Sequence, residues 1–543
     1  MELYEKLAAE QQVQRIPCWH DSELLLLPAC EADTFAAWDE AFAAAGYTKL
    51  DESEREGNCT AIYAGADAVY TLSYTAFEET CRLIRDTTTD LPLTPDTSTP
   101  ICPVLVTQMR LLYCCADCGM LYLIRLGDGR FVVIDAGMGE HEEPEHILEL
   151  LNAQNVREGR PTIAAWFFTH PHGDHYNAFV RFMERHGDTV VLESVLYNWP
   201  TTDKASGFSD LTWFDKTLAA LPNTKKITPR DGWNIVFPGV TFHVLYTCED
   251  LYPDPYDNIN DTSMVMRMDV GERRVLWLGD AQRKASGYIT KKYSKDILAC
   301  EILQVGHHGY WGGSDRLYTT ADPEILLWPC PDFWYQVITD WPCNKVLVTS
   351  EKIHSIFVSG RQEVTLNLSA TAPIPSDHCY GDFTYEEDFT DTDVYHKAWS
   401  SVTGGSTGYR GMDVSIDRGV CHLAAEENWS VLEWRQPGQM PDSYTFTARM
   451  CARTMGQIAL FWNHPTPTVW DDNAVLPLPL PLNRECTVTL TADAENHTAT
   501  LTIDGEIVWQ SDYTPANKHG LYLLLQNAKV DVMQLQLKLQ SQK

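Results

Sequence analysis

Three imidazoles and one carboxylate are crowded into residues 170–175, directly after an apolar run. The run, residues 163–168, has no charged side chain and is typical of a strand buried on both faces. The residues that follow it include His170, His172, Asp174 and His175. Such a cluster is poorly suited to a packed core, whereas imidazoles and carboxylates are common ligands of Zn and Fe. The segment therefore predicts two partial metal sites, side by side, at the end of a buried strand.

Three further apolar strands are expected to end in residues of the same kinds. An apolar strand that delivers polar side chains at its C-terminal tip lets a rigid sheet present a site at one edge, with loops above it. We therefore expect all four segments to contribute to one site. The three strand ends are residues 131–134 followed by Asp135, residues 275–278 followed by Gly279 and Asp280, and residues 302–305 followed by Gly306, His307 and His308.

The chain of 543 residues is long enough for several domains at about 150 residues each. Residues 104–370 alternate strands with helices, which is typical of a layered α/β domain. Residues 1–95 mix helix-like and strand-like pieces and predict a small α+β domain. Residues 376–543 show short alternating strands and turn residues, which predict an all-β sandwich. Within the α/β region we expect a helix over residues 178–185 and a strand over residues 345–349.

The chain is strongly acidic, with 75 acidic and 41 basic side chains and a net charge of -34. This balance argues against a broad nucleic-acid surface or an anionic-membrane surface. The N-terminus lacks a basic stretch followed by an apolar one, and no apolar run approaches the roughly 20 residues that a membrane helix needs. Cys115 and Cys118 form a CxxC pair without a second one, so a zinc ribbon is not expected. These features predict a cytoplasmic protein with reduced thiols.

The polar strand ends together resemble the metallo-β-lactamase superfamily over residues 104–370. The resemblance rests on the His-x-His-x-Asp-His pattern that starts at His170, on Asp135, on the Gly279-Asp280 pair and on the late histidine. Residues 260–268 and 305–309 are similar to a subgroup that includes the hydrolase domain of the DNA-uptake protein ComEC and phosphorylcholine esterase. The resemblance implies an αββα sandwich, flanked here by the small N-terminal α+β domain and a C-terminal jelly-roll sandwich.

The resemblance also implies a centre of two divalent metal ions, with Zn favoured and Mn or Fe open. One metal would take His170 and His172, and the other would take Asp174, His175 and His307. Asp280 would bridge the two, and Asp135 would orient ligands without binding metal. His307 is favoured over His308 because it follows the strand and its glycine directly, so His308 would face the substrate.

One ligand expected from the family is not evident in the sequence. Members of the superfamily usually supply a third histidine to the first metal, between the cluster and the bridging aspartate. His243 lies within an expected strand, and Cys248, Asp250 and Asp261 lie in the loop that follows. Cys248 is a further candidate ligand, although a buried thiol is the better interpretation of it.

The chemistry that such a centre implies is hydrolysis by a metal-bound hydroxide. Asp174 or Asp280 would take a proton, and His308 would protonate the leaving oxygen or stabilise its charge. The subgroup resemblance favours a phosphoester or phosphodiester of a small or glycan-linked substrate. A carboxylic ester, lactone or amide is the alternative for the same site.

The C-terminal region resembles concanavalin-like and laminin-G-like sandwiches through Phe389, Trp399 and the hairpin at residues 503–507. Domains of this kind often bind glycans with exposed aromatic side chains, although tryptophans also fill sandwich cores. A glycan-binding protein with a vestigial hydrolase domain is therefore a third hypothesis, which the near-complete ligand set disfavours. The tryptophans in question are Trp429, Trp434, Trp462, Trp470 and Trp509.

Overall fold

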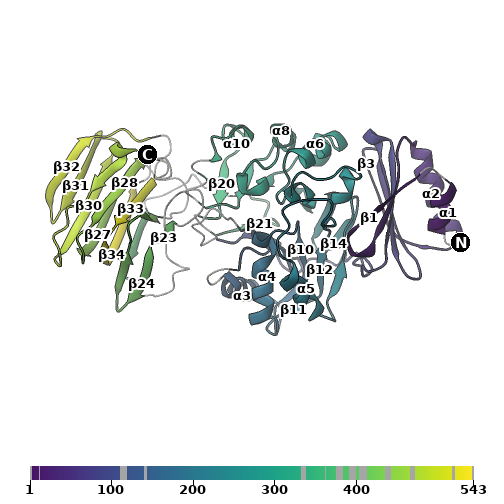
Figure 1. Cartoon of the computed structure of the whole chain (residues 1–543), viewed down its shortest axis with the longest axis horizontal. Coiled ribbons are helices and arrows are strands. Elements are labelled where there is room, and N and C mark those ends of the chain that lie inside the picture. Colours follow the sequence, from purple (N-terminus) through teal and green to yellow (C-terminus); the bar gives the residue numbers. More distant parts are fainter. Residues whose placement is uncertain are drawn as a thin grey trace.

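A single β-sheet and two sandwiches of two β-sheets each follow one another along the long axis of the molecule (Figure 1). The coordinates are a computed structural model of the chain. None of the described helices is long and apolar enough to cross a membrane. The structure describes residues 3–10, 13–110, 119–139, 143–331, 335, 338–360, 363–372, 374, 383–390, 399–402, 412–434, 442–464, 471–516 and 520–540.

The N-terminal region is a six-stranded antiparallel sheet with helices on one face, in the strand order β1-β2-β6-β5-β4-β3. Trp38 and Phe42 of helix α2 are buried against the sheet. Strands β4 and β5 form a hairpin that turns at residues 65–67, because Ala64 pairs with Val69. The elements are α1 (Leu3–Glu10), β1 (Gln14–Pro17), β2 (Glu23–Leu27), α2 (Ala32–Ala44), β3 (Thr48–Arg55), β4 (Asn58–Ala64), β5 (Val69–Thr75) and β6 (Thr80–Asp86).

The middle region is a sandwich of two mixed sheets. The first has the order β13-β12-β10-β9-β8-β7-β21, with β11 paired to β10, and the second has the order β14-β15-β16-β17-β18-β19-β20. The strands of the first sheet are β7 (Leu105–Gln108), β8 (Leu121–Arg125), β9 (Phe131–Asp135), β10 (Thr162–Phe168), β11 (Val191–Leu192), β12 (Ser194–Tyr197), β13 (Lys225–Ile227) and β21 (Val364–Asn367). Those of the second are β14 (Asn234–Phe237), β15 (Val240–Tyr246), β16 (Val265–Val270), β17 (Arg273–Trp277), β18 (Ile302–Gln304), β19 (Ile325–Trp328) and β20 (Ser355–Val358).

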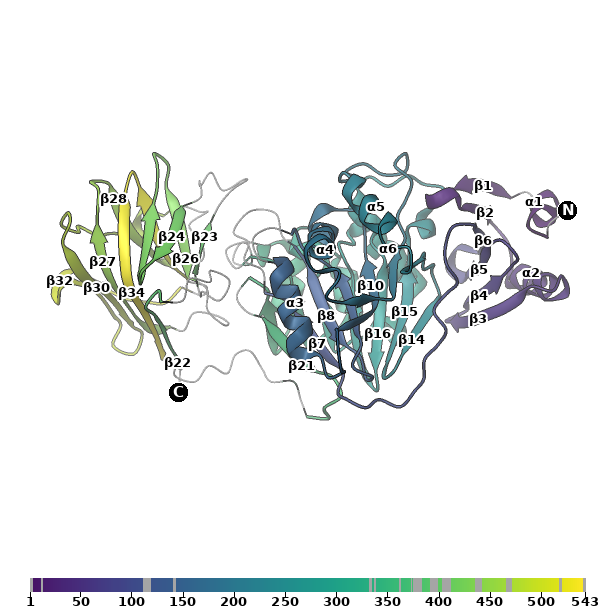
Figure 2. The same cartoon turned by 90° about the horizontal axis from the view of Figure 1, so that it is seen from below.

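Helices cover the outer face of each sheet, which confirms the expected αββα arrangement (Figure 2). The apolar run of strand β10 is continuous because alternate side chains point to opposite faces of the sheet, and both faces are buried. Phe167 meets Phe242 of the second sheet at a ring distance of 5.3 Å, whereas Trp166 meets Phe179 of α4 at 4.8 Å. The helices are α3 (Glu143–Gln154), α4 (Gly173–His186) and α5 (Thr212–Ala219) on the first sheet, and α6 (Arg283–Lys292), α7 (Lys295–Leu298), α8 (Asp315–Ala321) and α10 (Pro342–Val348) on the second.

Two expectations for the middle region need correction. The strand expected over residues 345–349 is wrong, because this segment belongs to helix α10, whose first residue is Pro342. A short apolar run does not distinguish a strand from a buried helix, and proline at the first helical position favours the helix. The helix expected over residues 178–185 begins earlier, at Gly173, so that Asp174 and His175 lie in its first turn.

The C-terminal region is an all-β sandwich, as expected. Its sheets have the orders β24-β25-β34-β27-β30-β31-β32, with β22 paired to β34, and β23-β26-β33-β28-β29. One sheet consists of β22 (Phe383–Glu387), β24 (Asp413–Asp417), β25 (Val420–Ala424), β27 (Ser443–Ala452), β30 (Glu485–Asp493), β31 (Thr498–Ile503), β32 (Glu506–Asp512) and β34 (Lys529–Gln540). The other consists of β23 (Trp399–Val402), β26 (Ser430–Trp434), β28 (Gln457–His464), β29 (Val475–Pro477) and β33 (Gly520–Gln526).

Some tryptophans of this sandwich pack in its core, and others lie outside the described residues. Trp462 is buried and lies at a ring distance of 5.3 Å from Trp509 and 5.5 Å from Tyr513. Core packing therefore accounts for Trp462, while Trp509 and Trp429 are half-buried. Glycan binding by this domain stays a prediction. The side chains of Trp399 and Trp434, all of Trp470 and the CxxC pair lie outside the described residues.

Candidate metal centre

The polar strand ends meet at one edge of the middle sandwich, and both sheets contribute to the meeting point. Strand β9 ends at Asp135 and β10 leads into His170, whereas β17 leads to Asp280 and β18 to His308. Gln304, the last residue of β18, links the two loops of the second sheet. Its side-chain oxygen accepts hydrogen bonds from the backbone N–H groups of Leu278 and Gly279, at 2.7 and 2.8 Å. Sequence reasoning missed this residue, which reads as an ordinary strand position.

Two groups of side chains bring potential ligand atoms within 4.8 Å of one another. We call them the four-residue group (Asp174, His175, Asp280 and His308) and the three-residue group (His170, His172 and Asp280). Asp280 Oδ2 lies 3.2 Å from His175 Nε2 and 3.6 Å from His170 Nε2. This carboxylate therefore joins the two groups.

Several atoms that face one another in these groups have no hydrogen-bond partner among the described residues, although they are buried. They are the Nε2 atoms of His170, His175 and His308 and the Oδ1 atom of Asp280. Buried polar atoms are normally satisfied, so a convergent set of unsatisfied ones calls for an explanation. Imidazole nitrogens and carboxylate oxygens are ligands for divalent transition metals, and a pair of such ions fits this donor set.

Two imidazoles of the four-residue group are anchored through their second nitrogen. His175 donates from Nδ1 to Asp135 Oδ2 at 2.9 Å, and His308 donates from Nδ1 to the carbonyl of Pro329 at 2.7 Å. Asp135 also accepts from the backbone N–H of Thr169 at 2.8 Å, so its carboxylate is itself fixed. These bonds leave Nε2 of each ring free to face the centre. Asp135 thus orients the ring of His175.

The carboxylates of the site favour positively charged groups beside them. Burial alone would lower the pKa of His308, but the carboxylates of Asp280 and Asp174 raise it to about 9. Burial likewise opposes the charged form of His175, yet Asp280, Asp174 and Asp135 hold its pKa well above the usual value. In the metal-free protein the carboxylates therefore keep protons on these rings, and divalent cations would satisfy the same electrostatic demand.

The three-residue group is anchored on a loop. His172 lies at the N-terminus of α4 and donates from Nε2 to the carbonyl of Gly207 at 2.8 Å. This bond leaves Nδ1 as the ring atom free to face the centre. Ser209 Oγ accepts from the backbone N–H of Gly173 at 2.9 Å, which ties the same loop to the start of the helix. No sequence motif indicated that Gly207 or Ser209 would contribute to the site.

The N-terminal region supports that loop. The ring of Trp19 stacks on Phe208 with centroids 6.5 Å apart and planes at 14°, and it meets the edge of Trp199 at 6.3 Å. Below this stack, Ala205 and Ile259 join a buried apolar cluster with residues of β1 and β2. A buried ion pair adds to the contact, because Arg230 bonds both Asp86 of the N-terminal sheet and Glu249 of the middle region.

The order expected for the two late histidines is reversed in the structure. His308 belongs to the four-residue group, whereas His307 Nε2 lies 3.9 Å from Asp280 Oδ2 and outside both groups. His307 donates from Nδ1 to the carbonyl of Tyr310 and accepts at Nε2 from the side chain of Asn260, at 3.0 Å. Both histidines have a left-handed backbone, with φ of 47° and 53°, so the turn sends the second ring into the centre.

None of the residues considered for the missing ligand reaches the three-residue group. His243 bonds Asn234 and Asp269, and Cys248 is fully buried, with the pKa of its thiol raised well above normal by burial. Asp261 accepts from the backbone at the start of α6, and Asp250 contributes to a capping box and faces Lys292. The third member of the group is Asp280 itself.

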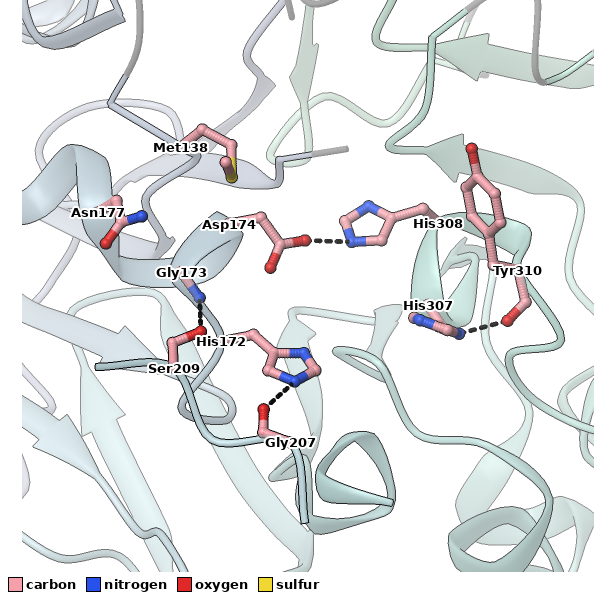
Figure 3. A pocket seen from close by; sticks show the side chains of 10 residues that line it. All are labelled: Met138, His172, Gly173, Asp174, Asn177, Gly207, Ser209, His307, His308 and Tyr310. Carbon is pink, nitrogen blue, oxygen red and sulfur yellow. Dashed lines mark hydrogen bonds and ion pairs between the residues drawn. The ribbon is translucent and has the colours of Figure 1, made fainter. Parts of the chain in front are cut away.

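A cavity of about 480 Å³ opens over the centre (Figure 3). Asp174 and His308 meet at its wall, with Asp174 Oδ2 and His308 Nε2 3.2 Å apart. No described lining residue carries a cationic Lys or Arg side chain. The lining residues are Met138, His172, Gly173, Asp174, Asn177, Gly207, Ser209, His307, His308 and Tyr310.

Comparison with protein families agrees with this geometry. Residues 119–328 match the model of the metallo-beta-lactamase superfamily. The middle region therefore carries a domain of this superfamily, as the sequence suggested. The proposed closeness to the ComEC and phosphorylcholine esterase subgroup stays a prediction. No curated protein sequence matches the chain.

Three solved structures show distant similarity. The metallo-β-lactamase fold protein YhfI from Bacillus subtilis is 15% identical, with 42% of this chain and 85% of that chain covered and a TM-score of 0.28. The diiron β-hydroxylase CmlA from Streptomyces venezuelae is 14% identical, with 50% and 55% covered and a TM-score of 0.32. A galectin-like protein of unknown function from Bacillus subtilis is 14% identical, with 30% and 98% covered and a TM-score of 0.22. Similarities this weak carry no argument about function.

Proposed function

We propose that this protein is a metal-dependent hydrolase with two divalent ions, one in each residue group. The observation that carries the proposal is the convergence of buried ligand atoms from both sheets on Asp280, several of which make no hydrogen bond to a described residue. Bound there, the ions would supply Lewis acidity and activate water. Zn is favoured by the ligand set, while Mn and Fe suit the same atoms.

The protein's own residues would divide the remaining work. Asp174 lies on the cavity wall and is partly exposed, so it can take a proton from attacking water, whereas Asp280 is committed to joining the two groups. His307 lies on the opposite wall with 22% of its side chain exposed. His307 would contact the substrate, but its Nε2 accepts from Asn260 and carries no proton, so the role at the leaving oxygen that the sequence suggested for His308 stays unassigned.

We further propose a phosphodiester as the substrate class. The similarity of residues 260–268 and 305–309 to phosphoesterases supports phosphorus over carbon. The described cavity lining offers no Lys or Arg, so the positive charge would come from the two ions alone. A diester carries one negative charge where a monoester carries close to two, and it therefore suits this lining better. A glycan-linked diester fits the same criteria.

The second candidate is an uncharged carboxylic ester or lactone. The described lining, which has no Lys or Arg, favours it as much as it favours a diester, since neither substrate needs a cationic side chain. The two candidates differ in the atom attacked, so a panel of substrates separates them.

The test is turnover by the metal-loaded full-length protein. We expect hydrolysis of bis-p-nitrophenyl phosphate, much weaker hydrolysis of p-nitrophenyl phosphate, and none of p-nitrophenyl acetate above background or of a homoserine lactone. Chelation should abolish the activity, and added Zn or Mn should restore it. Activity on the lactone alone would shift the assignment to the second candidate, and no activity on any member would contradict both.

A further inference from the structure

An exposed aromatic surface adjoins the metal cavity. Tyr310 lines the cavity, and Trp311, the next residue, is 52% exposed. Trp311 also has a backbone φ of 57°, a left-handed conformation that a bulky side chain rarely adopts. A large apolar side chain is therefore held in solvent by an unfavourable backbone, immediately beside the candidate centre. Packing of the core does not account for this arrangement.

The loop that carries Trp311 is held firmly in place. Three of its carbonyls accept hydrogen bonds from buried side chains: His308 from Trp328 at 2.9 Å, Gly309 from Asn344 at 2.7 Å, and Gly312 from Tyr318 at 2.8 Å. The loop also folds tightly on itself, because a Cβ atom at Gly312 would lie 1.9 Å from the carbonyl oxygen of Gly306. The backbone of the loop that carries both His308 and Trp311 is thus fixed on both sides of Trp311.

Trp341, which precedes helix α10, extends the surface. Its ring stacks on Trp311 with centroids 4.7 Å apart and planes at 21°, and Tyr310 meets it edge-on at 5.9 Å. Tyr310 in turn lies 6.1 Å from the ring of His307. A continuous row of rings therefore leads from the cavity wall to the exposed indole. We call Tyr310, Trp311 and Trp341 the aromatic platform.

We propose that the aromatic platform binds an uncharged ring of the substrate, which is attached to the phosphodiester held over the metal centre. This inference rests on the proposed function. Flat indole faces bind the faces of aromatic rings and the apolar faces of sugar rings. A polyanionic partner is disfavoured, because the chain has a net charge of -34 and the described cavity lining has no Lys or Arg. The platform would thus select the group beyond the phosphorus.

The test uses S-ethyl phosphorothiolate diesters, which all release ethanethiol when water replaces sulfur at phosphorus, and which differ in the O-substituent: phenyl, glucosyl or methyl. Released thiol is measured after quenching. For the Zn-loaded full-length protein we expect Trp311→Ala to lower kcat/KM about tenfold for a ring-bearing diester, mainly through KM. Turnover of the ring-free methyl diester should change less than about twofold. A loss confined to the phenyl or to the glucosyl diester would assign the platform to aryl groups or to sugars.

The matched control is Trp213→Ala. Trp213 is 59% exposed, but it lies on α5, on the other sheet of the sandwich, where Lys216 covers its ring. This variant should behave like the wild type with all three diesters. Equal losses on the methyl and ring-bearing diesters in Trp311→Ala, or no loss on either ring-bearing diester, would overturn the platform while leaving the hydrolase intact.

A binding measurement keeps the inference independent of turnover. Isothermal titration calorimetry with phenylphosphonate and methylphosphonate should give about tenfold tighter binding of the phenyl compound by the wild type, and similar binding of the two by Trp311→Ala. Failure of all three diesters to react, with this ring preference present, would count against the proposed activity and not against the platform. Equal binding of both phosphonates by the wild type would contradict the platform.

Discussion

The two halves of the candidate centre are built in different ways. The four-residue group is anchored within the metallo-β-lactamase domain, since Asp135 and the carbonyl of Pro329 orient its two imidazoles. In the three-residue group, His172 is anchored on the carbonyl of Gly207, and the neighbouring Phe208 rests on Trp19 of the N-terminal region. One half is therefore a property of the domain alone, whereas the other depends on contact between two regions of the chain.

The N-terminal region contributes to the site by supporting the loop that holds His172. Residues of β1 and β2 cover the loop beside the cavity through a buried apolar cluster, and the ion pairs of Arg230 with Asp86 and Glu249 add to the contact. A metal in the four-residue group has one more protein ligand than a metal in the three-residue group. We therefore expect the second metal to bind more weakly and to respond to changes in the N-terminal region.

The largest effect is expected from Asp280→Ala, because this carboxylate belongs to both groups. We expect the variant to retain neither metal after dialysis and to lose turnover to background, as measured by mass spectrometry of the metals and by diester hydrolysis. The control is Asp269→Asn, which changes a carboxylate that bonds His243 and Arg267 instead. Retention of both metals by Asp280→Ala would contradict a shared ligand.

A second pair of variants tests the order of the late histidines. His308→Ala should lose the metal of the four-residue group, because its Nε2 is one of the buried ligand atoms there that make no hydrogen bond. His307→Ala should keep both metals and raise KM with little change in kcat, because it removes a ring from the cavity wall while both residue groups stay intact. Metal analysis, kcat and KM decide between them. Loss of a metal in His307→Ala, with none lost in His308→Ala, would restore the order expected from sequence.

A smaller effect is expected from Asp135→Asn. The change weakens the hydrogen bond that orients His175, and such changes typically lower metal affinity about 10- to 100-fold. Competition with a coloured chelator measures the affinity of each metal. The loss should be confined to the more tightly bound ion, and an equal loss from both would show that the two halves are not anchored separately.

The smallest effect is expected from Trp19→Ala, which removes the ring stacked on Phe208. We expect the affinity of the more weakly bound metal to fall several-fold, with the tighter one unchanged. Phe77→Ala provides the control, because Phe77 is 39% exposed and contacts Tyr288, away from the cavity lining. If Trp19→Ala leaves the affinity of the weaker metal site unchanged, the N-terminal region does not support that site.

Much of the centre could be predicted because it lies at the ends of strands. Apolar runs that stop at polar residues mark where a buried sheet reaches the surface, and this placed Asp135, His170 and Asp280 together. The order of His307 and His308 could not be predicted, since both follow the same strand and a left-handed turn decides which ring enters. Strand alternation gives no information once the backbone leaves the extended conformation.

The remaining differences come from contacts distant in sequence. Gly207 supports His172 through its backbone carbonyl, which every residue possesses, so no residue type signalled the contact. Trp19 and Phe208 lie in regions that appeared independent, and only the folded chain brings their rings together. Helix α10 was mistaken for a strand because its core-facing run is short.

We infer that one centre binds two metal ions with unequal affinity. Stepwise removal of metal from the purified, loaded protein by increasing chelator, followed by mass spectrometry, measures this directly. We expect two equivalents in the wild type, released in two separate steps, and a single equivalent in His172→Ala that is released at the chelator concentration of the second step. Release of both equivalents in one step, or loss of both from His172→Ala, would contradict it.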